Sequence, residues 1–178
     1  REQSFDKLAQ HAEDEARSIV EGIALPLFRA GSLDDLVGNV EVYETLNRAN
    51  FGVIFADQLN KGLDAAQELG ASLGFSKGEI TELYLDRVGV LAIELGMPEL
   101  LDWTEKRDEE GVSVAGGALA DKVRRYRQEA ERARTSYIQA AERLASQERE
   151  RQQTIAVNQL RRNIATLYTI DNPVEAAK

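Results

Sequence analysis

Few residues in this sequence could carry catalytic or metal-binding chemistry. His11 is the only histidine and there is no cysteine, so neither a Cys/His metal cluster nor a disulfide framework is possible. A Ser–His–Asp triad would have to use His11, as would the Glu-x-x-His motif of di-iron bundles. No glutamate stands three residues before this histidine, because that position is Leu8. We therefore interpret His11 as a surface residue.

Three acidic clusters are the next candidates: Glu13-Asp14-Glu15, Asp34-Asp35 and Asp108-Glu109-Glu110. None has the alternating spacing and central glycine of a calcium loop. The segment "GGALADK" (residues 116–122) lacks the first glycine and the Lys-Ser/Thr ending of a phosphate-binding loop. We expect acidic surface clusters, no metal, no cofactor, no small-molecule substrate and no enzymatic activity.

The most basic stretch is "KVRRYRQEAERAR", residues 122–134. Arginines next to a tyrosine can bind nucleic-acid phosphates, although two glutamates interrupt this run. The candidate DNA-facing residues are Lys122, Arg124, Arg125, Arg127, Arg132 and Arg134. The alternative is that these side chains form the exposed face of a coiled coil.

Composition predicts an all-α protein. Only 3 of 178 residues are proline, and aromatic residues make up 6%, which is sparse for a sheet. No run of 18 apolar residues is present, so no membrane-spanning helix is predicted. Residues 1–116 contain 10 Lys/Arg and 23 Asp/Glu, whereas residues 117–170 contain 11 and 6. This split predicts two parts with different surroundings.

Residues 1–110 are expected to form an acidic, antiparallel helical-repeat-like array. Glycines at the expected helix ends, together with apolar residues at helical spacing, predict four helices, at residues 6–31, 32–47, 51–70 and 76–96. Gly31 is expected to cap the first helix, and Pro26 to kink or break it near Leu25. Ser76 and Glu79 form a predicted capping box.

A shift of 65 residues aligns the end of the first predicted helix with the end of the fourth, so that "LFRAGSLDDLV" echoes "AIELGMPELLD". Such self-similarity is typical of helical repeats, and it predicts two hairpin-like units at about residues 1–70 and 71–110. Any two helical hairpins share this arrangement, so the alternative remains open. In the second unit Pro98 favours a new helix start, with Leu101 and Trp103 packed inward and Asp102, Glu105 and Lys106 facing solvent.

A glycine-rich linker is expected at residues 111–117, followed by one long charged helix at residues 118–170, about 75 Å long. Apolar and small residues alternate at spacings of four and three and predict a coiled-coil-like seam. The seam consists of Leu119, Val123, Tyr126, Ala130, Ala133, Tyr137, Ala140 and Leu144.

The seam fails at Gln147 and Arg151, and a second apolar set resumes out of phase at Val157, Leu160, Ile164 and Leu167. This discontinuity predicts either local unwinding of a coiled coil or a helix break. We expect residues 159–168 to pack on a partner helix. Residues 171–178, with Asn172-Pro173, are predicted to leave the helix as an exit segment. Because the sequence starts at Arg1 without a methionine and without a signal-peptide pattern, we expect a fragment of a longer chain or a trimmed end.

Four segments together resemble the internal virion proteins of short-tailed phages, the ejection proteins held inside the capsid. They are "ELYLDRVGVLAIELG", "MPELLDWTEKRDEEGVSV", "DKVRRYRQEAERA" and "ERLASQERERQ", within residues 76–153. The turn at residues 107–111 is longer than the compact form of that family.

The resemblance implies a structural protein that forms a homo-oligomeric ring or tube with other core proteins and the portal. It also implies a conduit for double-stranded DNA, located first in the virion and then in the host cell envelope and periplasm. The alternative from the residues is a cytoplasmic helical-repeat adaptor that binds a protein partner and dimerises through its long helix.

Overall fold

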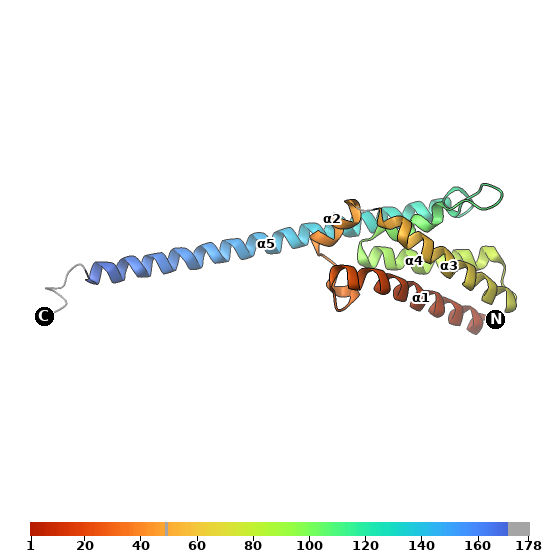
Figure 1. Ribbon diagram of the computed structural model, residues 1–178, viewed down its shortest axis with the longest axis horizontal. Helices are drawn as coiled ribbons and strands as arrows, with labels where there is room; N and C mark the ends of the chain where they lie inside the picture. Colours follow the sequence, from red (N-terminus) through yellow and green to blue (C-terminus); the bar gives the residue numbers. More distant parts are fainter. Residues whose placement is uncertain (49, 171–178) are drawn as a thin grey trace. The chain divides into compact units, whose positions relative to one another are not determined.

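The computed structural model describes residues 1–48 and 50–170. These residues are all-α and contain no strand, which confirms the predicted fold class. Contacts along the chain separate it into two units, Arg1–Ile138 and Gln139–Lys178. The elements are α1 (Glu2–Phe28), η1 (Leu33–Asp35), α2 (Val40–Arg48), α3 (Phe51–Ser72), α4 (Lys77–Leu95), η2 (Pro98–Glu105), η3 (Val114–Gly116) and α5 (Ala120–Ile170), and Figure 1 labels the α-helices among them.

The core of the first unit lies where α1, α3 and α4 pack along one another, with η2 against α3 and α4 (Figure 1). The buried face of α1 is rich in alanine, and residues such as Ala16 and Ala24 are fully buried and allow close approach of the neighbouring helices. At the centre the Trp103 ring meets the Tyr84 ring edge-on, with centroids 5.3 Å apart. The Tyr84 hydroxyl donates a hydrogen bond to the Leu59 carbonyl at 2.9 Å, so this buried polar group is satisfied.

The end of α1 corrects the predicted glycine cap. The helix continues through Pro26 and stops at Phe28, and Arg29 rather than Gly31 adopts the left-handed conformation (φ 52°). The N–H of Ala30 donates to the Leu25 carbonyl and that of Arg29 to the Pro26 carbonyl, the pattern of a Schellman motif. α4 ends in the same motif at Gly96 (φ 63°). The two ends are therefore alike, but they lie 67 residues apart instead of the predicted 65.

The predicted second helix, residues 32–47, is not continuous. It divides into the short η1 and α2 because Gly38, at φ 79°, interrupts the helical backbone. The Gly38 N–H donates to the Tyr43 hydroxyl at 2.9 Å, and the Asn39 side chain accepts from the Glu41 N–H at the start of α2. These hydrogen bonds between backbone N–H groups and nearby side chains thus take the place of about one turn of backbone helix.

The start of α4 has the predicted capping box. The Ser76 hydroxyl accepts from the Glu79 N–H at 3.1 Å, and the Glu79 carboxylate accepts from the Ser76 N–H at 2.8 Å. The second bond is the main reason that the pKa of Glu79 is lowered. Because these contacts join residues only three apart, they could be predicted from the sequence alone.

The segment predicted as a flexible linker, residues 111–117, is a hydrogen-bonded loop. The Asp108 carboxylate accepts from the N–H groups of Glu110 and Val112, at 2.9 and 2.8 Å. An isolated antiparallel bridge joins Arg107 to Ser113, and η3 follows. The first unit therefore includes this loop and extends to Ile138, beyond the boundary predicted at residue 110.

α5 is one uninterrupted helix from Ala120 to Ile170, so the loss of the heptad seam at Gln147 and Arg151 does not break it. The predicted exit segment, residues 171–178, lies outside the described residues.

Candidate functional site

The basic stretch of α5 begins against the acidic side of α4. The Lys122 ammonium donates to Glu82 at 2.9 Å and lies 3.0 Å from the Asp86 carboxylate. These two acids are four residues apart and therefore share one helix face. The hydrogen bond to Glu82 is the main cause that raises the pKa of Lys122. Tyr126, one turn further along α5, donates its hydroxyl to Asp86 at 2.7 Å.

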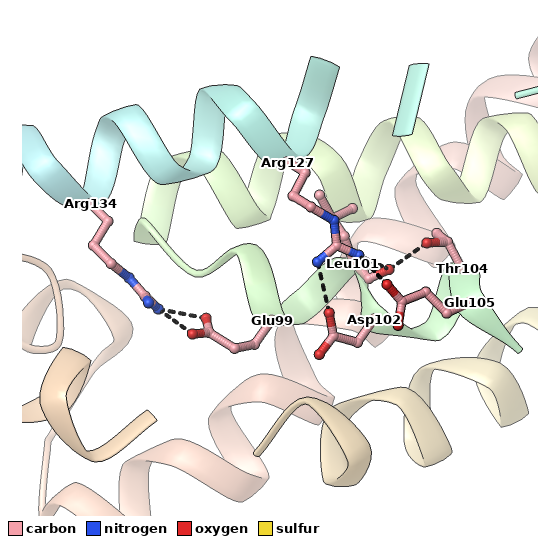
Figure 2. A network of polar contacts seen from close by, with 7 residues as sticks. All are labelled: Glu99, Leu101, Asp102, Thr104, Glu105, Arg127 and Arg134. Atoms are coloured by element: carbon pink, nitrogen blue, oxygen red, sulfur yellow. Dashed lines mark hydrogen bonds and ion pairs between the residues drawn. The ribbon is translucent and has the colours of Figure 1, made fainter. Parts of the chain in front are cut away.

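Arg127 is held by three acceptors on η2, as Figure 2 shows. Its guanidinium donates to the Asp102 carboxylate at 2.9 Å, to the Glu105 carboxylate at 3.3 Å and to the Leu101 carbonyl at 3.5 Å. Glu99, Asp102 and Glu105 recur every three residues, and in a 3-10 helix that spacing places them on one side. Asp102, which was expected to face solvent, is half-buried and pairs with Arg127, 25 residues further along the chain. Glu105 and Lys106 are exposed as predicted, although Glu105 also pairs with Arg127.

Asp102 also lies against the first turn of α3. A Cβ added at Gly52 would come 1.7 Å from an Asp102 carboxylate oxygen, so only glycine permits this approach. The carboxylate thus lies at the positive end of the α3 dipole as well as beside Arg127.

Arg134 is the most enclosed basic residue of the stretch, with only 9% of its surface exposed. It donates to the Glu99 carboxylate at 2.7 Å, to the Gly96 carbonyl at 2.8 Å and to the Asn47 side chain at 2.9 Å (Figure 2 shows the pair with Glu99). Its guanidinium also lies over the Tyr43 ring, 5.2 Å from the centroid. A cation this buried requires such a set of partners.

The six candidate DNA-facing residues therefore divide into two groups. Lys122, Arg127 and Arg134 form ion pairs inside the first unit. The exposed group consists of Arg124, which pairs with Asp121 on the same helix, together with Arg125 and Arg132. The sequence signal for the first group was a set of acidic residues at helical spacing, which indicates an acidic surface that could pair with these cations. The set consists of Glu82, Asp86, Glu99, Asp102 and Glu105. Which cations meet them depends on the fold.

The predicted seam of α5 is likewise divided. Val123, Tyr126 and Ala130 are buried and Leu119 packs on the same core, so this part of the seam has an intramolecular partner. Ala133 and Tyr137 are half-buried, and the Tyr137 hydroxyl donates to the Glu94 carbonyl at 2.8 Å. Ala140 and Leu144, in the second unit, are exposed.

α4 accepts this seam closely because glycine occupies two contact points, one within the helix and one at its C-terminal cap. A Cβ at Gly89 would lie 2.6 Å from the Tyr126 ring, and one at Gly96 would lie 3.0 Å from the Arg134 Cα atom. These glycines let α5 approach the backbone of α4. The sequence showed both glycines but did not show which helix would cross them.

The second unit presents the other apolar set on α5. Val157, Leu160, Ile164 and Leu167 are 47, 60, 50 and 58% exposed. From Gln139 to Thr169 no side chain is buried, and Ala141 is the only one that is half-buried. The stripe is therefore apolar, regularly spaced and open.

The described residues contain no group of three or more His, Cys, Asp or Glu side chains placed to hold a metal ion. His11 is exposed, and its Nδ1 atom lies 3.7 Å from the Glu15 carboxylate on the next turn of α1. No helix in the described part of the chain is both long and apolar enough to span a membrane.

No protein-family model, curated protein sequence or solved structure matches this chain.

Proposed function

We propose that this chain is a non-enzymatic helical adaptor that associates with a partner helix through residues 139–170 of α5. The observation that carries this proposal is the open stripe of Val157, Leu160, Ile164 and Leu167. A lone helix in water derives little stability from propensity alone, and most protein helices depend on packing of an apolar face. A partner helix on this stripe would supply that packing.

The contrast within α5 supports this role. Residues 120–138 have their apolar seam covered and several of their cations paired with carboxylates of the first unit. This half of the helix is anchored, and its apolar seam is not available to a partner. The remaining half is the part that can bind.

The test is light scattering on the full chain, compared with a variant in which Val157, Leu160, Ile164 and Leu167 are all replaced by glutamine. We expect particles of more than one copy for the natural sequence and monomers for the variant, with the same Trp103 fluorescence because Trp103 is buried in the first unit. Equal masses for the two proteins would overturn the proposal.

A role in a phage virion core is the second candidate, and the exposed Arg124, Arg125 and Arg132 are the observation that favours it. In this role the chain would form rings or tubes of many copies, and the exposed arginines would contact DNA phosphates. Electron-microscope imaging of the light-scattering fraction, with and without double-stranded DNA, tests it. Rings that bind DNA less tightly when these three arginines become glutamate would support it, and particles of only two copies with no DNA affinity would contradict it.

A further inference from the structure

We infer that the partner of the stripe is a second copy of this chain, and that the two α5 helices pair in parallel and in register through Val157, Leu160, Ile164 and Leu167. This inference rests on the proposed function, because it names the partner of the same helix face. It is argued from the kinds of residue on the stripe, from the charges beside it and from the extent of the helix that carries it.

The spacing of the stripe assigns each residue to a coiled-coil position. Steps of three, four and three residues place Val157 and Ile164 at positions a, and Leu160 and Leu167 at positions d. β-branched residues at a with leucine at d favour two-stranded parallel coiled coils over trimers and tetramers. The side chains thus match the geometry of a pair of identical helices.

The residues that flank the stripe permit this pairing. Ala156 and Asn163 occupy positions g, and Arg161 and Tyr168 occupy the e positions that follow them. In a parallel pair a g residue faces an e residue of the other helix, so Arg161 meets the alanine and Tyr168 meets the asparagine. No like charges face each other across this seam.

The preceding a and d positions limit the seam on its N-terminal side. They are Arg143, Ser146, Glu150 and Gln153. In a parallel pair two Glu150 carboxylates would face each other, and so would two Arg143 guanidinium groups, which is unfavourable. The apolar contact therefore begins near Val157 and covers about two heptads. A seam this short predicts a dimer in the micromolar rather than the nanomolar range.

The helical state of α5 reduces the ordering that dimerisation requires. The stripe continues a helix that begins at Ala120 and packs on the first unit over residues 120–138. Nucleation, the costly step in forming a helix, has already occurred there. Two heptads can then associate with a smaller loss of conformational entropy than in an isolated peptide.

Ile155 provides a matched control on the same helix. It occupies position f, on the outer side of the proposed pair, and is 46% exposed, against 50% for Ile164. We expect Ile164→Ala to weaken dimerisation of the full chain by about a hundredfold, because both copies lose a packed side chain. Ile155→Ala should leave the dissociation constant within about twofold of the natural value, because position f makes no contact. Sedimentation equilibrium over the micromolar range gives both constants.

Parallel orientation can be tested separately, since the sequence has no cysteine. In a parallel, in-register pair Val157 faces its own counterpart, so the Val157→Cys variant should form an intermolecular disulfide on mild oxidation. In an antiparallel pair of the same stripe Val157 would face Leu167, which places the two introduced thiols about 15 Å apart along the axis. The Ile155→Cys variant is the control, and we expect little crosslinking from it.

The outcomes separate this inference from the proposed function. A two-copy mass, sensitivity at Ile164 but not at Ile155, and crosslinking at Val157 would support the inference. Suppose that the fourfold glutamine variant abolishes assembly, but that the natural chain forms particles of more than two copies or that the Val157→Cys variant does not crosslink. This result would overturn the parallel pair and leave the proposed function standing. A monomer for the natural chain at every concentration would overturn both this inference and the proposed function, because the natural chain and the fourfold glutamine variant would then have equal masses.

Discussion

The two halves of α5 have the same local structure and different surroundings. Residues 120–138 have a seam that packs on α4 and η2, while residues 139–170 have a seam that no part of the described chain buries. Both seams show heptad spacing, and both halves carry a net positive charge. The difference arises from what lies opposite each half, since the first meets glycines and carboxylates of its own chain. Periodicity therefore identifies a packing face without identifying its partner.

The largest difference between the halves is expected from the same substitution at two alanines. Ala130 is fully buried, whereas Ala140 is exposed. Ala130→Glu would force a carboxylate into packed space and should lower the free energy of unfolding by about 4 kcal/mol. Ala140→Glu should change it by less than about 0.5 kcal/mol. Urea unfolding followed by Trp103 fluorescence measures both, and similar effects at the two sites would contradict the division of α5.

Two ion pairs give the next comparison. The Arg134 and Glu99 side chains are only 11 and 14% exposed, whereas Arg151 and Glu148 are 70 and 49% exposed. Arg134→Met leaves the Glu99 carboxylate enclosed without a cation and should cost about 3 kcal/mol of stability. Arg151→Met should cost less than about 0.5 kcal/mol.

A compensating variant tests the cause of the Arg134 effect. If the unpaired Glu99 charge is responsible, Arg134→Met combined with Glu99→Leu should recover a large part of the lost stability in the same urea experiment. No recovery would show that the packing and hydrogen bonds of Arg134 with Gly96 and Asn47 matter more than its ion pair.

Glycine-to-alanine changes should have opposite signs at two helical positions. At Gly89 a new Cβ would lie 2.6 Å from the Tyr126 ring, and we expect a loss of about 1–2 kcal/mol after the gain in helix propensity is included. At Gly22 nothing lies within 4 Å of a new Cβ. Gly22→Ala should therefore stabilise the protein by about 0.5–1 kcal/mol. Thermal unfolding checks the signs, and stabilisation at Gly89 would contradict the close contact of α4 and α5.

The last prediction concerns alkaline pH. Burial, together with the hydrogen bond to Asp86, raises the pKa of Tyr126 above its usual value of 10.0. Because the folded pKa exceeds the unfolded one, the protonated hydroxyl stabilises the fold fully below about pH 10 and ceases to do so as pH rises through the folded pKa. Tyr126→Phe should cost about 1 kcal/mol at pH 8 and progressively less above pH 10. Urea unfolding at pH 8 and at higher pH measures this difference, and a constant difference would exclude a contribution from the tyrosine proton.

Much of the helix pattern could be predicted from the sequence, including the capping box at Ser76, the glycine end at Gly96 and the long last helix. The errors lie where a local interaction competed with the pattern. Gly38 divides the predicted second helix, and Arg29 ends α1 two residues before the predicted Gly31. Both errors arose because the apolar periodicity continues across a backbone position that is not helical.

The candidate site was predictable only in part. The basic run, the seam and the second apolar stripe could all be read from residue types and spacing. That Lys122 meets Asp86 and Arg134 meets Glu99 could not, because these partners are 36 and 35 residues apart. The spacing of the basic residues in the run 122–134 was compatible both with a surface that binds DNA and with the exposed face of a coiled coil between two copies of the chain.

The sequence by itself determined where the helices of this protein begin and end, with few exceptions, and which of their faces are apolar. These properties depend on residues within one or two turns of each other, through caps, propensity and periodicity. Only the tertiary structure decided that cations and apolar residues of the first half of the long helix contact other residues of the same chain. It also decided that the apolar residues of the second half remain exposed. That choice depends on which distant glycines and carboxylates come within contact distance, and no local pattern contains that information.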